Sequence, residues 1–278
     1  ARARQLFPKG CEFIEGDIRK DQDLDDAFSG SQFVLHQAAL GSVTRSIDRP
    51  ADTFDNNVMG TLRVFMAAKR ASIKRVVYAS SSSVYGDHPD LPKFEDKIGR
   101  CLSPYALSKA VAEQLGDLYS RTLGLEAIGL RYFNVFGPRQ NPEGPYAAVI
   151  PLWFKTLAQG QAPFINGDGK TSRDFCYVAN AVQANIRGAL TTHSEAVGKV
   201  FNVSCGDRTD LNLLFELIRD LVAVKQPAAA GLKPQYRDFR PGDVRHSLAD
   251  ISLAAKLLGY APTHDLKQGL HAAASWYL

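Results

Sequence analysis

The sequence lacks the patterns that mark several classes of protein. Its four cysteines, Cys11, Cys101, Cys176 and Cys205, lie far apart and form no C-x-x-C pair. This spacing favours reduced structural thiols over disulfides or a zinc site. The six histidines show no H-E-x-x-H spacing, so we expect no catalytic metal. No apolar run approaches the ~18 residues of a transmembrane helix.

The charge balance and the N-terminal stretch narrow the function further. The stretch ARARQLFPKG is basic but lacks the apolar run of a signal peptide, which predicts a cytoplasmic protein that does not bind a membrane. Lysine and arginine number 33 against 29 acidic residues, and the net charge of +4 is spread along the chain. This does not favour nucleic acid as a partner, although a few arginines in a cleft would suit an anionic small molecule.

Short apolar segments alternate with amphipathic ones. The expected strands are residues 12–15, 33–36, 76–80, 126–131 and 200–203, and the expected helices lie near 21–28, 51–71 and 105–123. This alternation predicts an α/β fold with a Rossmann-like, doubly wound parallel sheet. From about Asn134 the pattern becomes irregular, and a series of prolines interrupts it: Pro138, Pro142, Pro145, Pro151 and Pro163. The change predicts a smaller mixed α/β lobe that binds the substrate.

The expected helix after Pro104 has the clearest signals. Ser103 is suited to cap it, Pro104 suits its first position, and Gly124 is placed to end it. Val111, Leu115 and Leu118 recur at spacings of three and four, which predicts one apolar stripe.

Several expected strands end in small or polar residues. These ends are EGD at 15–17, HQAA at 36–39, SSSS at 80–83 and YFN at 132–134. Because the carboxyl ends of parallel strands meet at one edge of a sheet, they indicate a ligand site there. The four serines are therefore either a solvated linker or a row of hydroxyls facing a substrate, and the apolar strand before them favours the second.

Tyr105 and Lys109 are four residues apart on the expected helix, which places both side chains on one face. A neighbouring ammonium favours the phenolate and so lowers the pKa of a tyrosine. A Tyr–Lys pair is therefore a plausible general acid and base, although the same spacing is common in ordinary surface pairs.

Taken together, these segments resemble the extended short-chain dehydrogenase/reductase family along almost the whole chain. The matching segments are FIEGDIR, LHQAA, NNVMGTL, YASSSSVYGD, SPYALSK, LRYFNVFGPRQ, DGKTSRDFCYV and RPGDVRHSLAD. The resemblance implies that Ser81, Tyr105 and Lys109 are catalytic and act beside bound NAD. It also implies a homodimer that pairs the helices 51–71 and 105–123 of two subunits in a four-helix bundle.

Within this family the sequence is most similar to sugar-nucleotide 4-epimerases, in particular the subgroup acting on UDP-N-acetylglucosamine, UDP-N-acetylgalactosamine or their uronic acids. Related dehydratases carry an Asp–Glu pair where this chain has Ser82 and Ser83. Arg173 is suited to a pyrophosphate. Ser247 stands where epimerases restricted to non-acetylated sugars have a bulky tyrosine, which leaves room for a 2-N-acetyl group.

The resemblance implies roles for further residues. Those implied for the cofactor are Asp17 and Ile18 at the adenine, the small Ala38 and Ala39, Asn56 tying the cofactor side of the sheet together, Ser80, Tyr132, and again Tyr105 and Lys109. Those implied for the UDP-sugar are Ser42, Ser81, Ser82, Asn134, Ala148, Val149, Arg173, Arg240, Asp243 and Ser247.

Plainer roles remain open for some of these side chains. Asp17 would serve equally as a turn cap, Asn134 as a loop amide and Arg173 as half of a surface pair with Asp174. We expect His36 to be structural.

One family pattern does not occur in this sequence. The glycine-rich dinucleotide fingerprint and the acidic residue after it are absent, as though the N-terminal β-α-β of the fold were missing. Either the chain is a piece of a longer protein, which we favour, or it is a shortened form that binds NAD weakly. The expected domains are 1–133, with a crossing segment of about 174–206, for the cofactor, and 134–173 with 207–278 for the sugar nucleotide.

Three functions therefore compete. The first is the epimerase of N-acetylated UDP-hexosamines through a transient 4-keto sugar. The second is a UDP-glucuronate 4-epimerase or decarboxylase, for which a 6-carboxylate would need an additional cation or amide that the sequence does not place. The third is a non-catalytic protein that retains the fold, which the intact Ser81, Tyr105 and Lys109 disfavour.

Overall fold

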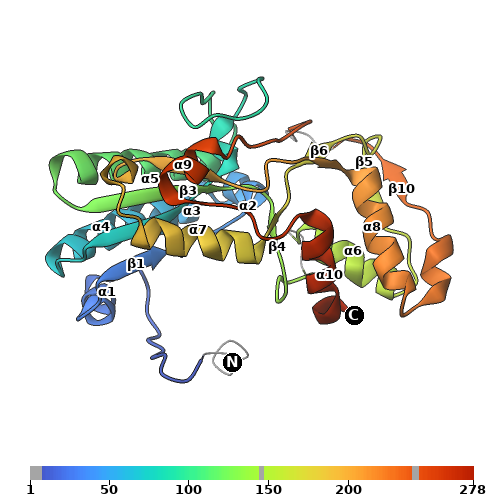
Figure 1. Cartoon of the computed structure of the whole chain (residues 1–278), viewed down its shortest axis with the longest axis horizontal. Helices are drawn as coiled ribbons and strands as arrows, with labels where there is room; N and C mark the ends of the chain where they lie inside the picture. Colours follow the sequence, from blue (N-terminus) through green and yellow to red (C-terminus); the bar gives the residue numbers. More distant parts are fainter. Residues whose placement is uncertain (1–7, 144–146, 240–243) are drawn as a thin grey trace.

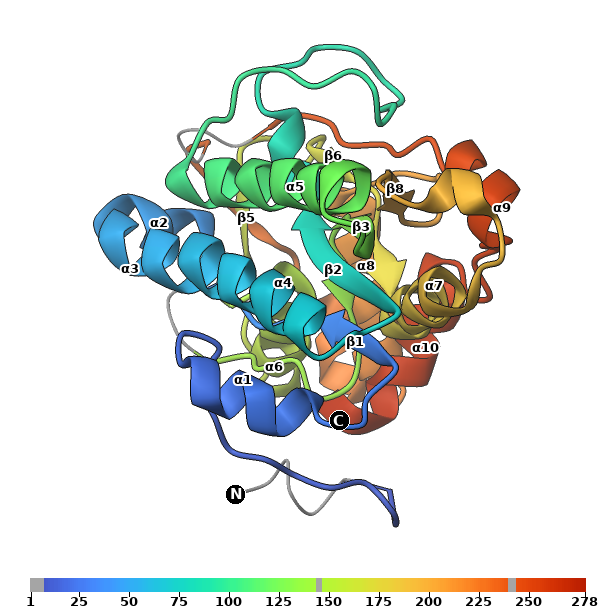
Figure 2. The same ribbon diagram turned by 90° about the vertical axis from the view of Figure 1, so that its left-hand side faces the viewer.

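A computed structural model describes residues 8–143, 147–239 and 244–278. Its main sheet (Figure 1) has four parallel strands, β1 (Phe33–His36), β2 (Arg75–Ser81), β3 (Glu126–Tyr132) and β8 (Val200–Val203), and Figure 2 shows them in that spatial order. The Rossmann-like α/β prediction is thereby confirmed, and these four strands lie within a residue or so of the predicted positions. The crossovers between neighbouring strands are helical, as parallel pairing requires.

Helices cover both faces of this sheet. On one face lie α1 (Asp21–Phe28), α4 (Gly60–Arg70) and α5 (Pro104–Thr122), and on the other lie α7 (Val178–Leu190) and α9 (Ser252–Leu258) (Figure 2). Strand β2 shows why, because Val76 and Tyr78 face the first group while Val77 faces the second. Each of these described helices is too short or too polar to cross a membrane.

The predicted strand at 12–15 is wrong. Residues 11–16 are exposed, and this segment is not paired with a strand among the residues that the structure describes. An apolar alternation forms a strand only when a neighbouring strand takes up its backbone hydrogen bonds.

The predicted helix at 51–71 is interrupted. It consists of α3 (Pro50–Phe54), a π-helical turn (Asp55–Met59) and α4 in continuous succession. The π turn holds an extra residue per turn, which changes the side chains that face inward there.

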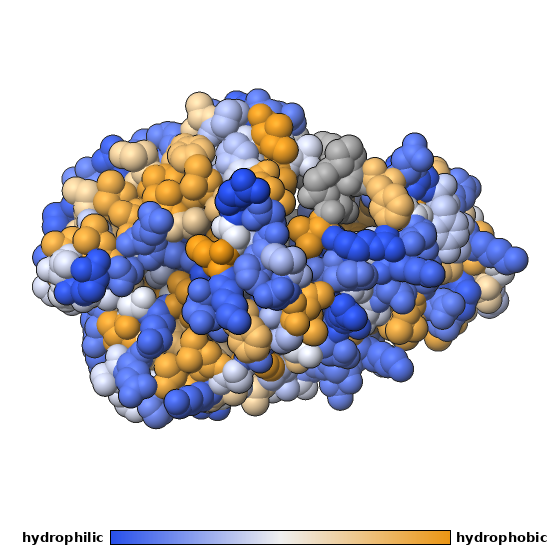
Figure 3. Space-filling view, turned by 90° about the horizontal axis from the view of Figure 1, so that it is seen from above, coloured by the Kyte–Doolittle hydropathy of each residue, from blue (hydrophilic) through white to orange (hydrophobic). Residues whose placement is uncertain are grey.

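Helix α5 begins and ends as predicted, but its apolar stripe is only partly buried. Ser103 caps it by accepting from the Ala106 amide, and Gly124 has φ +71° just beyond its end. The buried face carries the small residues Ala112 and Gly116, while Leu118 is 42% exposed. Apolar side chains also gather over the half of the surface that holds α5 (Figure 3).

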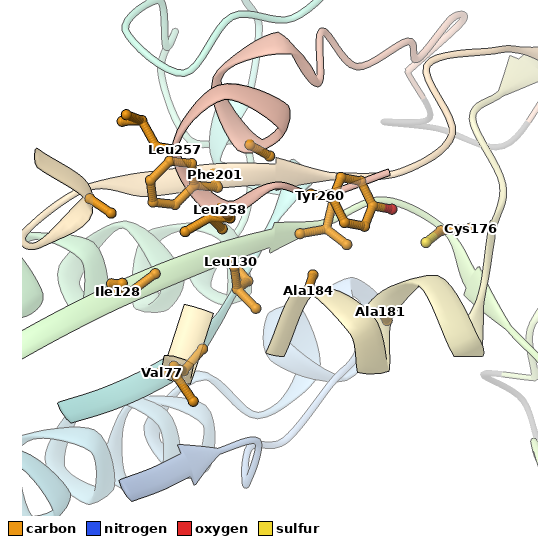
Figure 4. Close-up of a cluster of buried hydrophobic side chains, with 14 residues drawn as sticks. Val77, Ile128, Leu130, Cys176, Ala181, Ala184, Phe201, Leu257, Leu258 and Tyr260 are labelled. Atoms are coloured by element: carbon orange, nitrogen blue, oxygen red, sulfur yellow. The ribbon is translucent and has the colours of Figure 1, made fainter. Parts of the chain in front are cut away.

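The sheet has two apolar clusters, and a third lies outside it. The cluster between the sheet and helices α7 and α9 includes Val77, Ile128, Leu130 and Phe201 (Figure 4). The third is formed mainly by α6 (Val149–Ala158), α8 (Leu211–Ala223), α10 (Leu266–Tyr277) and β5 (Phe164–Asn166), which pairs with β10 (Gln235–Arg237). This second lobe has its own core, and α9 returns from it to the sheet.

Candidate active site

Ser81 and Tyr105 meet at the carboxyl edge of the sheet. Ser81 is the last residue of β2 and caps the short 3-10 helix η3 (Ser82–Tyr85). Its hydroxyl accepts from the Ser83 amide at 3.2 Å and from the Ser83 hydroxyl at 3.0 Å. Burial raises the pKa of the Tyr105 phenol, and a hydrogen bond with Ser81 acts to lower it.

Lys109 lies one turn after Tyr105 on α5 and is only 6% exposed. Its ammonium donates to the Ala79 carbonyl oxygen at 2.9 Å and lies 6.0 Å from the centre of the Tyr105 ring. Burial lowers the pKa of Lys109 to about 8. The lysine joins α5 to β2, and it keeps further N–H donors for a ligand.

The expected effect of Lys109 on Tyr105 is wrong for this structure. The pKa of Tyr105 is raised, because burial of the phenol outweighs the hydrogen bond with Ser81, and Lys109 is not among the causes of the shift. The ammonium is directed to a backbone carbonyl oxygen instead of to the phenolic oxygen.

A cavity of about 550 Å³ lies beside these residues. Its walls come from the segments after β1, β2 and β3 and from residues 244–247. The described lining residues include two cations, Lys93 and Arg173, together with His246, and none of them is Asp or Glu. The full described lining is Val43, Thr44, Ile47, Ser82, Ser83, Tyr85, Gly86, Lys93, Leu102, Ser103, Ala106, Asn134, Arg173, Val244, His246 and Ser247.

Four of the residues expected at the UDP-sugar line this cavity: Ser82, Asn134, Arg173 and Ser247. The Asn134 amide donates to the Asp174 carbonyl oxygen at 3.1 Å, and the Arg173 guanidinium donates to the Ser172 carbonyl oxygen at 3.0 Å. Both side chains are therefore anchored by the backbone and face the cavity from fixed positions.

Ser42, Ala148 and Val149 were also expected at the UDP-sugar but are not among the lining residues, and Ser81 lies directly beside the cavity residue Ser82. Ser42 caps the helix α2 (Val43–Asp48) by accepting from the Arg45 amide, and the cavity begins at the next residue. Ala148 and Val149 form the start of α6, and Val149 packs on the second-lobe core. They do not line this cavity. Arg240 and Asp243 lie outside the described residues.

The turn after β1 is held by a residue that the sequence analysis missed. Asn57, in the π turn, accepts from the Leu40 amide and donates to the Leu40 carbonyl oxygen and to the Ser108 hydroxyl. It thereby joins this turn to α5. The tie assigned to Asn56 is wrong, because that amide donates to Asp52 of its own helix. Ala38 and Ala39, in the same turn, are exposed.

The side chain of Ser80 is directed to α5, and its expected place on the cofactor side stays a prediction. It is 3% exposed, and its hydroxyl donates to the Glu113 carboxylate at 2.5 Å. That carboxylate also pairs with Arg131 at 2.7 Å. Successive side chains of a strand face opposite sides, which separates Ser80 from Ser81.

Asp17 and Ile18 form the turn that precedes α1. The Asp17 carboxylate accepts from the Arg19 amide and guanidinium, which lowers its pKa to about 2. Ile18 packs against Gly60 of α4, where an added Cβ would lie 2.6 Å from its Cδ1 atom. The alternative of Asp17 as a turn residue therefore has structural support, and an adenine contact stays a prediction.

A second cavity of about 450 Å³ lies at the carboxyl ends of β1 and β3. Tyr132 and Gln37 line it together with apolar residues of α7. The Tyr132 hydroxyl accepts from the Asn185 amide at 2.6 Å, and burial raises the pKa of the phenol to about 12. His36 is buried against the Thr61 hydroxyl, and burial lowers its pKa to about 4, which agrees with a structural role.

These features suit a nicotinamide dinucleotide. Lys109 presents ammonium donors beside Tyr105, and the small residues Ala38 and Ala39 leave the turn after β1 open to the approach of a ligand. The parallel sheet, with Ser81 at a strand end and a Tyr–Lys pair on the next helix, defines a Rossmann-type oxidoreductase-like enzyme.

The chain belongs to the NAD-dependent epimerase/dehydratase family, whose model matches residues 1–204. The cofactor of this enzyme is accordingly NAD. A UDP-glucose 4-epimerase of Mycolicibacterium smegmatis is 33% identical over 269 residues, which is 96% of this chain and 82% of that protein.

Two solved structures extend the comparison. The UDP-N-acetylglucosamine 4-epimerase of Methanobrevibacter ruminantium, in complex with UDP-N-acetylmuramic acid, is 38% identical with a TM-score of 0.87 and covers 95% of this chain and 82% of that one. The UDP-glucuronic acid 4-epimerase of Bacillus cereus, in complex with UDP-glucuronic acid and NAD, is 27% identical with a TM-score of 0.86 and covers 99% and 84%.

Lys93 and His246 are among the cavity residues that the sequence analysis did not assign to the site. Lys93 comes from the loop between η3 and α5, and the Nδ1 atom of His246 lies 2.8 Å from the Ser172 hydroxyl. Neither stands in a spacing that predicts a site, because long-range packing alone brings them to the cavity.

Proposed function

We propose that this protein is an NAD-dependent 4-epimerase of UDP-N-acetylhexosamines, the N-acetylglucosamine and N-acetylgalactosamine forms or their uronic acids. One observation carries the proposal. Ser81, Tyr105 and Lys109 meet beside a cavity lined by hydroxyls and cations, in which none of the described lining residues is a carboxylate. Such a lining suits an anionic sugar nucleotide.

In the proposed reaction Tyr105 is the general base. As phenolate it removes the proton of the sugar 4-hydroxyl, and Ser81 hydrogen-bonds to the same oxygen and supports the phenolate. When bound, NAD would supply the acceptor and donor of the C4 hydride. Lys109 holds the nicotinamide ribose. Between the two hydride transfers the 4-keto sugar rotates to present its opposite face, after which Tyr105 returns the proton to the 4-oxygen.

The hydroxyls after Ser81 favour epimerisation over loss of water. Ser82 and Ser83 both line the cavity. A hydroxyl of ordinary pKa is a poor acid or base for elimination, whereas the related dehydratases have carboxylates there. Ser83, which we expected mainly to shape the turn, also supplies a hydroxyl to the cavity wall.

Arg173 and Ser247 support the substrate class. A guanidinium matches the paired oxygens of a diphosphate, so Arg173 is the proposed diphosphate ligand. Ser247 lines the same cavity with a small side chain, which leaves room for a 2-N-acetyl group. The second candidate is a UDP-glucuronate 4-epimerase, which the relative that binds UDP-glucuronic acid favours.

We also propose a homodimer through α4 and α5. Helix α5 packs beside the α3–α4 stretch, and exposed apolar side chains on these helices include Met59, Met66, Leu107 and Leu118. An apolar face of this kind is commonly covered by a partner, and a second copy would pair the same helices.

The experiment follows product stereochemistry by proton NMR. The full-length protein is incubated separately with UDP-N-acetylglucosamine, UDP-glucose and UDP-glucuronic acid. We expect interconversion of the N-acetylglucosamine and N-acetylgalactosamine forms, and its loss in Tyr105→Phe. Release of CO2 from UDP-glucuronic acid would instead identify a decarboxylase, and no turnover of any substrate would identify a non-catalytic protein.

A further inference from the structure

Lys93 is held rigidly at the wall of the main cavity. Its amide donates to the Leu248 carbonyl oxygen at 2.8 Å, and its carbonyl oxygen accepts from the Asp250 amide at 3.0 Å. The Asn202 side-chain amide donates to the same carbonyl oxygen at 2.8 Å. Two of these hydrogen bonds fix the loop residue against the segment that follows Ser247, and the third ties it to β8.

The ammonium of Lys93 is buried without a carboxylate partner. The residue is 5% exposed, and its ammonium donates to the His88 carbonyl oxygen and lies 6.0 Å from the centre of the Tyr85 ring. No Asp or Glu of the described chain lies within ion-pair distance of it. The nearby carboxylate that interacts with the charge of Lys93 is that of Asp90, and the Asp90 side chain is exposed.

A buried cation of this kind is costly unless an anion compensates it. One carbonyl oxygen occupies one of the three N–H donors, and the other two remain for a ligand. Because the residue lines the cavity, that ligand is most simply an acidic group of the substrate.

Lys93 lies apart from Arg173, the other cation of the cavity wall. Ser172, next to Arg173, bridges to His246, whereas Lys93 bridges to Ala249. His246 and Ala249 are three residues apart, which is about 10 Å along an extended chain. If Arg173 holds the diphosphate, a group at Lys93 is farther out, at the sugar.

Two neighbours also place Lys93 at the sugar end. Tyr85 belongs to η3, the helix that directly follows Ser81. Leu248 directly follows Ser247. Lys93 therefore lies between the catalytic turn and the residue proposed to make room for the N-acetyl group.

We propose that Lys93 binds a carboxylate on the sugar, so that the site takes UDP-hexuronic acids, N-acetylated ones included, in preference to the neutral sugars. This inference rests on the proposed epimerase function. When the 4-keto sugar rotates to present its opposite face, its C2 and C6 edges exchange sides of the cavity. A cation on one side of the cavity therefore meets the C6 carboxylate in one of the two orientations.

The test compares matched acidic and neutral substrates. The pairs are UDP-glucuronic acid with UDP-glucose, and UDP-N-acetylglucosaminuronic acid with UDP-N-acetylglucosamine. Lys93→Met removes the charge while keeping the length of the side chain, and Lys93→Arg keeps the charge. Lys97→Met is the control, because Lys97 is an exposed lysine of the same loop.

We expect Lys93→Met to raise KM for the acidic sugars about 30-fold, the effect of losing one charged hydrogen bond, and to leave KM for the neutral sugars within about threefold. Lys93→Arg should retain most of the preference, and Lys97→Met should leave all constants unchanged. Binding of UDP-glucuronic acid and UDP-glucose to Tyr105→Phe and to Tyr105→Phe/Lys93→Met, by calorimetry, gives the same comparison without turnover.

The outcomes separate this inference from the proposed function. Equal losses on acidic and neutral sugars would make Lys93 structural, and no loss would remove it from the site. In both cases the epimerase proposal survives on the neutral substrates. If no UDP-sugar is bound or turned over, both proposals fail.

Discussion

The carboxylate of Asp174 accepts a 2.5 Å hydrogen bond from the hydroxyl of Ser204, and both residues are fully buried. The same carboxylate accepts from the amides of Cys205, Gly206 and Ala249. Asp174 directly follows the cavity residue Arg173. Its hydrogen bonds therefore tie this part of the chain to the segment beyond β8 and to the segment beyond Ser247. It is the point where the walls of the cavity are held together.

Asp174→Asn should destabilise the protein. The amide oxygen can replace one carboxylate oxygen, but its NH2 group faces backbone donors, so we expect a loss of about 2–3 kcal/mol in the free energy of unfolding at pH 7. Urea denaturation measures it. A loss under 0.5 kcal/mol would show that the hydrogen bonds of Asp174 contribute little.

The difference in stability between the wild type and Asp174→Asn should also depend on pH, with a sign that follows from the pKa of Asp174. Burial raises the pKa of Asp174 to about 6. The folded protein therefore holds the proton of Asp174 more tightly than the unfolded chain, in which the pKa has its ordinary value of 3.8. This proton stabilises the fold fully below pH 3.8, and the stabilisation is lost as the pH rises through 6. The stability of the wild type relative to Asp174→Asn should therefore fall by about 2 kcal/mol between pH 4.5 and pH 7. A difference that rises with pH would contradict the raised pKa.

Ser81→Ala tests the support of the catalytic phenol. The variant loses the hydrogen bond that lowers the pKa of Tyr105, so the acid limb of the pH–rate profile should move to higher pH. We expect kcat/KM at pH 7 to fall about 100-fold. Ser31→Ala is the control, since Ser31 is an exposed serine that does not line the cavity and its loss should change the rate by less than about threefold. An unshifted limb in Ser81→Ala would remove Ser81 from this role.

Arg131→Met should be strongly destabilising. Arg131 and Glu113 form a 2.7 Å ion pair with side chains that are 3% and 10% exposed. Removing the guanidinium leaves a buried carboxylate uncompensated, at a cost of about 3–5 kcal/mol. The double variant Arg131→Met/Glu113→Leu should recover part of this loss in urea denaturation, and a double variant no more stable than Arg131→Met would count against the explanation.

Gly116→Ala tests the close approach of α5 to β2. A Cβ atom at Gly116 would lie 2.4 Å from the Tyr78 hydroxyl oxygen, and both residues are buried. Overpacking of this kind costs about 1–3 kcal/mol. Adding Tyr78→Phe removes the hydroxyl and should restore part of the stability; thermal unfolding of the two variants compares them.

Met66→Glu with Leu118→Glu tests the homodimer. Both side chains are about two-fifths exposed on α4 and α5, so charges there would be buried in the proposed interface. Light scattering should show the wild type at twice the mass of the variant. Leu190→Glu, on the exposed end of α7, is the control and should stay dimeric. A monomeric wild type would exclude the dimer.

The sequence predicted those parts that depend on local signals. Strands β2, β3 and β8 are built around short apolar segments, and α5 has both a capping serine and a terminating glycine. Ser81, Tyr105 and Lys109 follow from these elements, because a strand end and one helix face position all three. Ser82, Asn134, Arg173 and Ser247 were placed by the family resemblance, and they line one cavity.

Features that depend on distant neighbours were missed or misplaced. Residues 12–15 have a strand-like pattern, but a strand depends on a partner elsewhere in the chain. The π turn shifts the inward position from Asn56 to Asn57. Lys93 reaches the cavity through its pairing with Ala249, more than 150 residues away in the chain, and no local pattern records that pairing.

The return of α9 to the sheet also limits how the molecule can be divided. The apolar cluster beneath the sheet takes Leu257 and Leu258 from a segment that follows most of the second lobe. A single cut in the chain therefore separates neither core cleanly, and a fragment ending before residue 252 would expose the sheet. Limited proteolysis should accordingly give nicked molecules that stay together, and the two lobes should unfold in one transition.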